Sequence, residues 1–485
     1  MAITYDDMAL KCLEGPFVFR LNENGTGPHL LVQVCTERGW REYAGDNNVF
    51  KDRWNLWWRS GGFPSAHCRP PLSWQFVNRI PKGNSICRKD NLIRHLKCMK
   101  KVYGSIYDFS PTGYNLPSEY TRLVEDYSRF EKDEKVWICK PVGQSQGRGI
   151  FLFRKISDLR YDHAAVVQRY IENPLLIGGY KFDLRLYVCV PSYRPLTLYL
   201  YKEGLVRFAT EKFSLEHLED PFRHLTNFSL NKLGPGYNEK KERIGAGCKW
   251  TFRQLRRFLE QSGYSDWFLW QRIASLISLT ILSQAAGIPK SSNCFEFFGF
   301  DVLIDENLKP WLLEVNLSPA LSNDCEIDSE VKKPLLHDLF DLLGLPLGQS
   351  TPEVYPGSWS RYNPLWMDKC IRRGFRGNND EEYPQSSVWD NGKDWSTPCV
   401  REGGWIRIFP LNRHKTIEQL ECTRPYIRGH KMVEKEVRNA VISIQKYLKT
   451  AKEIQRKSGK LGDQKCNALL QAALDLNTEV WLPEK

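Results

Sequence analysis

The chain of 485 residues lacks the features that would carry it into or across a membrane. Its first residues, MAITYDDMALKCLEG, contain no apolar run behind a basic end, so we expect no secretory signal. The nearest candidate for a membrane span, residues 273–288, is interrupted by Ser275, Ser278, Thr280, Ser283 and Gln284. The 14 cysteines form no CxxC pair and no Cys/His cluster at zinc spacing, which favours reduced thiols over disulfides. We therefore expect a soluble, intracellular protein that does not bind membranes.

Nucleic-acid-binding modules and internal repeats are also missing from the sequence. The chain nevertheless has 69 Lys and Arg against 57 Asp and Glu, a formal net charge of +12. Such an excess indicates an acidic partner, which is a nucleic acid, an anionic membrane or an acidic polypeptide. Because no module for nucleic acid is present, we expect no nucleic acid and favour an acidic protein.

Hydrophobic residues make up 41% of the chain and aromatic residues 13%, which is typical of a globular protein with two or three domains. Strand-like runs recur from residue 136 onward, and several links between them are too short for a parallel crossover. The pattern predicts a mixed α/β (α+β) fold with a largely antiparallel sheet. We expect helices over residues 88–103, 118–132, 265–286, 329–343 and 432–457, a short strand over 31–35, and a loop-rich region over 346–420.

The segment WLLEVNLSPAL, residues 311–321, places a carboxylate and an amide at the end of an apolar strand. Side chains alternate along a strand, so Glu314 and Asn316 point to the same face. Asp301 lies upstream in a second strand-like run, FGFDVLID. Three oxygen ligands of this kind suit Mg²⁺, which prefers oxygen and often binds phosphates as well. The segment alone is equally consistent with a buried strand whose polar residues satisfy backbone groups.

A glycine-rich turn follows a lysine in the run KPVGQSQGRGI. Lys140 ends one strand, and the glycines of the turn allow backbone amides to close on an anion. The run is not a Walker A loop, because no GK[ST] ends it and a strand follows. It predicts a flap over a nucleotide, although most loops of this kind are ordinary hairpins.

Charged and apolar residues alternate in KFDLRLYV, with Lys181, Asp183 and Arg185 on one face of the expected strand. The alternation indicates a strand that lines a polar cleft, and a solvated edge strand is the alternative. Arg207 follows in GLVRFAT and Lys249 in GCKW. Arginines facing such a cleft would bind carboxylates in a bidentate manner.

These motifs occur in one order, together with WICKP, VVQRYIENPLLI, HLTN and CFEFFGFDVLID. The ordered set closely resembles the tubulin-tyrosine-ligase-like family of ATP-grasp ligases over about residues 35–345. The resemblance implies an ATP-grasp-like fold with three domains followed by an extension. Their expected bounds are an N-terminal domain at 1–87, a central domain with the flap at 88–166, a C-terminal ATP/Mg domain at 167–345, and an extension at 346–485 with the basic helix 432–457.

The resemblance also implies which residues bind the nucleotide. Lys140 would contact phosphate, and Lys89 corresponds to a second phosphate-binding lysine. The implied nucleotide-binding residues are Lys140, Gln146, Gly147, Gln168, Arg169, Tyr170, Ile171, Lys181, Phe182, Asp183, Thr226 and Asn227.

The remaining site residues are implied in the same way. They comprise two catalytic cations, four residues that hold the incoming amino acid and three that hold Mg²⁺. These are Arg185 and Lys181, then Arg207, Phe228, Ser229 and Lys249, then Asp301, Glu314 and Asn316.

Within the family the chain looks most like the polyglutamylases. The implied activity is ATP-dependent addition of free L-glutamate to glutamate side chains in the acidic C-terminal tails of tubulin, through an acyl-phosphate. Two positions depart from the glutamate-ligase pattern: Leu317 stands where His is frequent, and Phe228 where Tyr is frequent. A glycine or tyrosine ligase, or a microtubule-binding protein without catalysis, therefore stays open.

The implied cofactors are ATP and Mg²⁺, and the implied partner is tubulin or the microtubule. We expect a monomer in the cytoplasm and on the microtubule cytoskeleton, the cilium or basal body included. The basic helix 432–457 is either an ordinary amphipathic helix or a contact to the microtubule surface.

Overall fold

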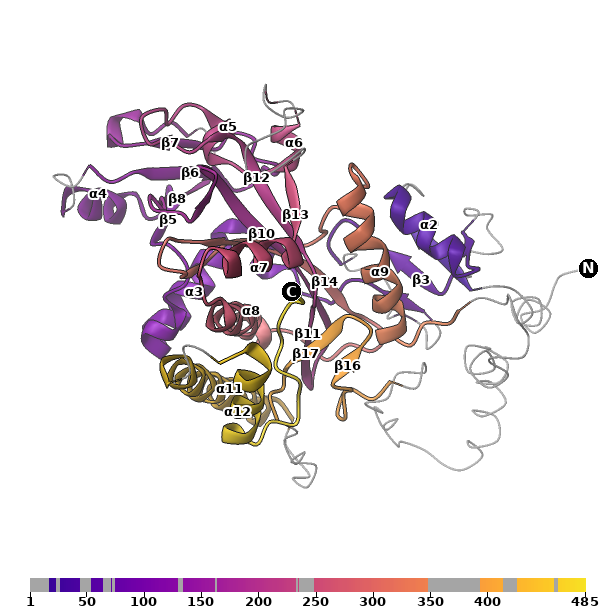
Figure 1. The fold of residues 1–485 in the computed structure, drawn as a ribbon. Helices are drawn as coiled ribbons and strands as arrows, with labels where there is room; N and C mark the ends of the chain where they lie inside the picture. The colour runs from indigo at the N-terminus through magenta and orange to yellow at the C-terminus, as the bar shows by residue number, and fades with distance from the viewer. Residues whose placement is uncertain are drawn as a thin grey trace, which may run out of the picture.

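A computed structural model describes residues 17–22, 27–43, 54–63, 71, 75–129, 134–161, 164–232, 234, 248–347, 393–412, 425–457 and 461–485, the side chains of 425–433 excepted. Within these residues, two antiparallel sheets and a smaller parallel sheet are surrounded by helices (Figure 1). The helices are α2 (His29–Glu37), α3 (Lys89–Tyr103), α4 (Tyr120–Arg129), α5 (Pro221–His224), α6 (Phe228–Asn231), α7 (Phe252–Gln261), α8 (Trp267–Ala285), α9 (Glu326–Leu342), α11 (Pro425–Lys457) and α12 (Asp463–Leu474). The predicted mixed fold is confirmed.

The largest sheet is antiparallel and is built around β10, a strand of 14 residues. Strand β14 pairs with one edge of β10, while β12 and β11 pair with the beginning and the end of the other edge. The strands are β9 (Leu176–Ile177), β10 (Tyr180–Tyr193), β11 (Leu196–Tyr201), β12 (Leu205–Lys212), β13 (Lys249–Thr251), β14 (Glu296–Ile304), β15 (Pro310–Asn316), β16 (Arg401–Glu402) and β17 (Trp405–Phe409).

The register of this sheet aligns charged residues across neighbouring strands. Arg185 on β10 lies opposite Asp301 on β14, which in turn lies opposite Glu314 on β15. A second row runs from Asp183 on β10 through Arg207 on β12 to Lys249 on β13. The alternate residues of β10, such as Phe182, face a fully buried apolar core. The predicted alternation of charged and apolar faces is therefore confirmed.

A second antiparallel sheet of four strands lies beside the first, in the order β5-β8-β6-β7. Strands β6 and β7 form a hairpin whose turn is the glycine-rich run at 142–150. These strands are β5 (Gly113–Leu116), β6 (Trp137–Pro141), β7 (Phe151–Phe153) and β8 (Ala165–Arg169).

A small parallel sheet near the start of the chain corrects one expectation. The strands are β1 (Val18–Leu21), β2 (Arg41–Glu42), β3 (Leu56–Trp58) and β4 (Phe76–Val77). The strand predicted over residues 31–35 is wrong, because this stretch lies inside helix α2. Its buried residues Leu30, Leu31, Val34 and Cys35 have the spacing of one helical face. In a short apolar run this spacing is hard to distinguish from that of a strand.

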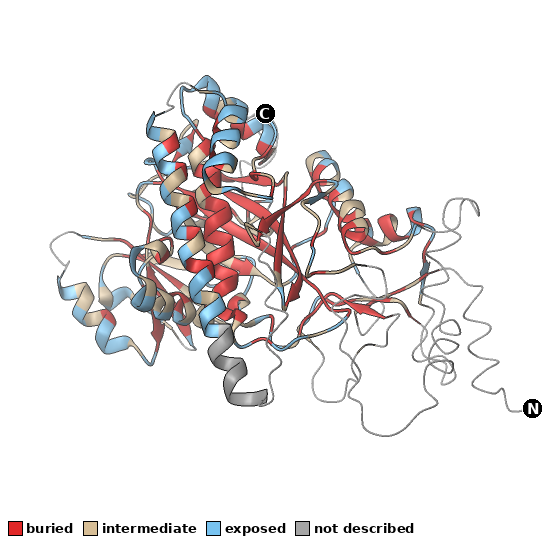
Figure 2. Cartoon of the chain, turned by 90° about the horizontal axis from the view of Figure 1, so that it is seen from below, coloured by how far each residue is buried: buried red, intermediate tan, exposed pale blue. Residues whose placement is uncertain are grey.

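The predicted helices at 88–103, 118–132, 265–286 and 329–343 are confirmed within a few residues by α3, α4, α8 and α9. Helix α8 is buried along nearly its whole length, which explains why its sequence is apolar on all sides. Figure 2 shows buried residues throughout the strands, while the outer helices keep exposed faces.

The extension after residue 345 is less loop-like than its composition suggests. Residues 348–392 lie outside the described part, but β17 in the sequence WIRIF adds to the main sheet beside β11. The basic helix predicted over 432–457 is confirmed as part of α11, which packs on α8 through Ala440, Val441 and Ile444. Helix α12 and the C-terminal segment complete this layer.

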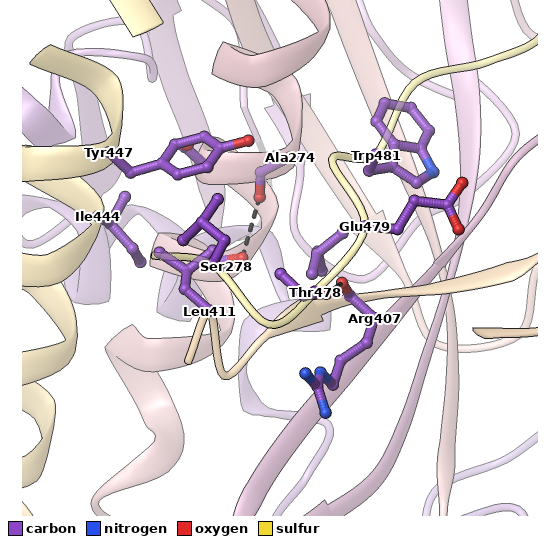
Figure 3. A pocket seen from close by; sticks show the side chains of 12 residues that line it. Ala274, Ser278, Arg407, Leu411, Ile444, Tyr447, Thr478, Glu479 and Trp481 are labelled. Carbon is purple, nitrogen blue, oxygen red and sulfur yellow. Dashed lines mark hydrogen bonds between the residues drawn. The ribbon is translucent and has the colours of Figure 1, made fainter. Parts of the chain in front are cut away.

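A small cavity remains where α8, α11, β17 and the C-terminal segment meet (Figure 3). It has an accessible volume of only about 20 Å³ and is lined by apolar side chains, hydroxyl groups and the charged side chains of Arg407 and Glu479. Ser278 Oγ donates to the carbonyl oxygen of Ala274 at 3.0 Å, and Tyr447 Oη donates to Gln271 Oε1 at 2.7 Å. These two hydroxyl groups are therefore satisfied by the protein itself.

Candidate active site

A larger cavity lies between the two antiparallel sheets, under the turn that joins β6 and β7. Its accessible volume is about 90 Å³, and the empty space counted to its open mouth is about 830 Å³. Strands β6 and β8 supply one wall, and β10, β14 and β15 supply the other. Most of the predicted nucleotide-binding residues line it, namely Lys140, Gln146, Gly147, Gln168, Arg169, Tyr170, Ile171, Lys181, Asp183, Thr226 and Asn227.

One predicted nucleotide-binding residue does not line this cavity. The side chain of Phe182 is fully buried in the apolar core on the opposite face of β10. The alternation of β10 makes this unavoidable, because its neighbours Lys181 and Asp183 face the cavity.

The turn between β6 and β7 needs glycine for two separate reasons. Gln146, Gly147 and Gly149 all have positive φ, at 62°, 80° and 67°. A Cβ on Gly147 would also lie 3.1 Å from Asn227 Oδ1. The turn can therefore approach the cavity closely and direct backbone N–H groups toward an anion.

Three lysines converge on the cavity from different elements. Lys140 Nζ donates to Gln168 Oε1 at 2.9 Å, and Lys89 Nζ at the start of α3 donates to the Gln144 carbonyl at 2.7 Å. Burial lowers the pKa of Lys140 to about 8 and that of Lys181 to about 7. Glu314 near Lys140 and Asp183 near Lys181 offset part of this lowering, but neither lysine donates a hydrogen bond to a carboxylate, so a bound anion would stabilise the charged form further.

A hydrogen-bonded chain orients Lys181. Its Nζ donates to Tyr170 Oη at 2.8 Å and to the His224 carbonyl at 2.8 Å. Tyr170 Oη lies 3.1 Å from His224 Nδ1, and His224 Nε2 lies 2.9 Å from the His217 carbonyl. Because His224 must donate from Nε2 to that carbonyl, its Nδ1 accepts from Tyr170. The residues predicted from the sequence include Thr226 and Asn227 of the HLTN motif but not His224.

Two carboxylates and one amide meet at the junction of β14 and β15. Asn316 Nδ2 lies 3.3 Å from Asp301 Oδ2 and 3.4 Å from Glu314 Oε1. Burial and the nearby charge of Asp301 raise the pKa of Glu314. Burial alone would raise the pKa of Asp301, but Arg185 and Arg207 hold it well below its usual range.

This trio fits a hard divalent cation by its donor chemistry, since all three groups offer oxygen. The amide of Asn316 can present its oxygen after a simple rotation about its last side-chain bond. Among the described residues, no cluster of three or more His, Cys, Asp or Glu side chains has the arrangement of a metal site. The two carboxylates would thus depend on Asn316, or on phosphate oxygens, for further ligands.

Arg185 and Arg207 both bind the buried carboxylates. Arg185 donates to both oxygens of Asp301, at 2.6 and 3.1 Å. Arg207 lies between Asp183, at 2.7 and 2.5 Å, and Asp301, at 2.8 Å. Thr226 Oγ1 also donates to Asp183 at 2.7 Å. Both predicted arginines therefore contact Asp301, and neither lines the nucleotide cavity.

The predicted amino-acid residues form a neighbouring cluster. Lys249 Nζ lies 3.8 Å from the centre of the Phe228 ring and 2.6 Å from Asp328 Oδ2. Lys332 approaches the other oxygen of Asp328 at 2.8 Å. Ser229 lies beside Phe228 in the single turn of α6. The sequence predictions did not include Asp328 and Lys332, because both lie on helix α9, outside every strand motif.

No helix in the described part of the chain is long and apolar enough to cross a membrane. The profile described as "Tubulin-tyrosine ligase family" matches residues 66–352. This stretch contains every predicted site residue and most of the two antiparallel sheets.

Several curated proteins are similar to this chain. "Probable tubulin polyglutamylase TTLL2" of Mus musculus is 48% identical over 335 residues, which cover 68% of this chain and 62% of that protein. The Homo sapiens protein of the same name is 47% identical over 335 residues, covering 68% and 56%. "Tubulin polyglutamylase TTLL5" of Homo sapiens is 37% identical over 425 residues, covering 80% and 33%. The matched regions thus span less than two thirds of each of these relatives.

Proposed function

The chain belongs to the tubulin-tyrosine ligase family, and from this premise we propose that it is an ATP-dependent protein-glutamate ligase acting on tubulin. The reaction would join free L-glutamate to glutamate side chains in acidic tubulin tails. The proposal rests on one observation above all: the cavity between the two antiparallel sheets carries convergent lysines on one side and two neighbouring buried carboxylates on the other. The printed names of the similar proteins agree with it.

In the proposed nucleotide site, the cations facing the cavity bind the phosphates of ATP. Lys140, Lys181 and Lys89 would hold the triphosphate beneath the turn that contains Gly147. Lys181 is oriented for this by its contacts with Tyr170 and the His224 carbonyl. Positioned cations stabilise charge on a transferring phosphoryl group, and they need little rearrangement because they are already fixed.

We assign Asp301, Glu314 and Asn316 to Mg²⁺, which would neutralise phosphate charge when bound. The assignment is supported by the raised pKa of Glu314, which arises from burial and from the repulsion of Asp301. Arg185 already donates two hydrogen bonds to Asp301, so it lies at the same edge of the sheet. It is therefore suited to stabilise the charge of a reacting carboxyl group.

The chemistry then proceeds in two steps. The acceptor carboxylate attacks the γ-phosphorus of ATP, which forms an acyl-phosphate and releases ADP. The α-amine of free glutamate next attacks the acyl carbon, and phosphate leaves as the amine loses a proton. Phosphorylation is needed because a free carboxylate is a poor electrophile. We assign Lys249, Phe228, Ser229 and Arg207 to the incoming amino acid.

A second activity, transfer of glycine or tyrosine, is suggested by two departures from the glutamate-ligase pattern. The resemblance implies that Leu317 and Phe228 border the amino-acid pocket, where glutamate ligases often have His and Tyr. The buried carboxylates of Asp183 and Asp301 also neutralise Arg207 in part. A less cationic pocket would accept a smaller or apolar amino acid.

The deciding experiment incubates unmodified tubulin with the protein, Mg-ATP and equal amounts of glutamate, glycine and tyrosine, followed by mass spectrometry of the tails. Mass steps of one glutamate are expected. Steps of another residue would reassign the pocket, and no steps with intact ATP binding would contradict the ligase proposal. The Glu314→Gln variant, which keeps the side-chain shape, is the negative control.

The finer assignments are proposals of the same kind. We propose three domains at 1–87, 88–166 and 167–345, with an extension at 346–485, and a monomeric protein located on the microtubule cytoskeleton. The exposed basic face of α11, with Lys446, Lys449 and Lys452, would add to attraction by an acidic tubulin surface.

A further inference from the structure

A basic groove lies between helices α3 and α4, outside the cavity just described. Its accessible volume is about 320 Å³. Its lining contains four cations and one carboxylate, and no aromatic side chain. The lining residues are Arg94, Lys97, Cys98, Lys101, Asn115, Ser118, Glu119 and Arg122.

The cations on one side of the groove come from a single face of α3. Arg94, Lys97 and Lys101 are separated by three and four residues, the spacing that places side chains in one row. Arg94 and Lys101 are exposed. This row therefore presents a strip of positive charge along about two turns of helix.

The single carboxylate of the groove is already bound. Glu119 accepts two hydrogen bonds from Lys97, at 2.9 and 2.8 Å, and one from the Asn115 backbone N–H at 2.8 Å. Arg122 lies 3.5 Å from the same carboxylate, with its side chain largely exposed. Once Glu119 is counted against Lys97, the charges of Arg94, Lys101 and Arg122 remain available to a partner.

The lining of the groove favours a polypeptide over a single-stranded nucleic acid. Nucleic-acid grooves use aromatic stacking, which this lining does not offer.

The groove also lies within reach of the proposed reaction centre. Helix α3 begins at Lys89, which lines the nucleotide cavity, and Arg94 and Lys101 follow five and twelve residues later. At ~1.5 Å per residue this places them roughly 8 and 18 Å along the helix. An extended peptide covers that distance with about three to six residues.

We propose that the α3–α4 groove binds an acidic stretch of the polypeptide acceptor, about three to six residues away from the glutamate that is modified. The proposal rests on the proposed ligase function for its biological meaning. Binding itself requires neither ATP nor a free amino acid, so the two proposals can fail separately.

The test measures binding of a fluorescent polyglutamate peptide of about ten residues to the full-length chain by anisotropy, at low and moderate salt. The groove variant combines Arg94→Gln, Lys101→Gln and Arg122→Gln. The matched control combines Lys155→Gln, Arg257→Gln and Lys465→Gln, which remove the same charge from exposed positions outside the groove and outside the basic face of α11.

We expect the groove variant to bind the peptide about five- to fifty-fold more weakly and with a shallower salt dependence, since each exposed ion pair contributes modestly. The control should lose much less, and both variants should keep wild-type ATP binding. Equal losses in the two variants, or a loss in the control alone, would overturn the proposal. So would a groove variant that loses affinity for an oligonucleotide of equal charge but not for polyglutamate.

Discussion

Two buried clusters of charged residues in this protein differ in whether their charges have partners of opposite sign. Around Arg256, the guanidinium donates to Asp266 at 2.8 and 3.2 Å, to Asp463 at 2.8 Å, and to the Pro483 carbonyl. Around the candidate active site, Lys140 and Lys181 have only neutral hydrogen-bond partners at short range, and Glu314 faces another carboxylate. The Arg256 cluster is complete in itself, whereas Lys140 and Lys181 have no hydrogen-bonded partner of opposite charge among the described residues.

The contrast shows how burial separates structural from functional charge. A fully paired cluster joins segments distant in sequence, here α7, α12 and the C-terminal end. An incompletely paired cluster costs stability, and a chain tolerates that cost where the charges act on a ligand. The comparison predicts that one cluster governs stability and the other activity.

The largest expected effect is on stability. Arg256→Ala should lower the free energy of unfolding by ~3–5 kcal/mol, because it leaves two carboxylates and a carbonyl without their buried partner. Thermal or denaturant unfolding measures it. Arg257→Ala, at the exposed neighbouring position, is the control and should change stability very little. Equal effects of the two substitutions would contradict the structural role of the Arg256 cluster.

The next effect separates activity from stability. Glu314→Gln should reduce ligase activity about 10²- to 10³-fold, as removal of a positioned charged group does at other active sites. The free energy of unfolding should stay the same or rise, because one of two repelling carboxylates becomes neutral. Parallel activity and melting measurements decide this, with exposed Glu330→Gln as control. Retained activity would remove Glu314 from the proposed metal site.

A third prediction concerns the backbone next to the arginines. A Cβ on Gly299 would lie 2.8 Å from Pro319 Cβ and 3.2 Å from Arg185 Cδ. Gly299→Ala should therefore displace Arg185, lowering activity about ten-fold and stability by ~1–3 kcal/mol. Gly287→Ala meets no atom closer than 3.7 Å and serves as control. Wild-type activity in Gly299→Ala would show that the position of Arg185 is not critical.

The smallest expected effect is a dependence of ATP affinity on pH. It distinguishes the two clusters because an arginine stays charged over the physiological pH range. Burial lowers the pKa of Lys181 to about 7, so above pH 7 the free protein must take up a proton to bind phosphate with a charged lysine. ATP affinity should then fall as pH rises, by at most about ten-fold per pH unit for one proton. Calorimetric titrations between pH 6.5 and 8.5, values roughly bracketing that pKa, measure the slope. Lys181→Met should remove the part of the slope near pH 7 and leave the part near pH 8, where Lys140 titrates. An unchanged slope near pH 7 in that variant would assign that proton elsewhere.

Sequence patterns predicted strands of the largest sheet well, because charged and apolar residues alternate along them with a period of two. The same reasoning failed at residues 31–35, where five apolar and polar residues fit a strand and a helix equally well. It also missed β17, whose pairing partner β11 lies some 200 residues earlier. Local pattern says little about such long-range pairing, which depends on the docking of whole segments.

For the candidate site, the nucleotide-binding residues predicted from motif resemblance line one cavity, with the exception of Phe182. The motifs could not predict which partners each charged residue contacts. That Arg207 lies between Asp183 and Asp301, and that Asp328 binds Lys249 and Lys332, follows from strand register and helix docking.

By itself the sequence determined the fold class, the family resemblance and the residue types available for chemistry, because these depend on local alternation and on motif order. The tertiary structure decided which charges are satisfied and which are not, because pairing depends on distances between segments far apart in the chain. Only packing places the carboxylates of Asp266 and Asp463 against Arg256. Only packing likewise gives Lys181 the hydroxyl of Tyr170 and the carbonyl of His224, and no carboxylate, as hydrogen-bond partners.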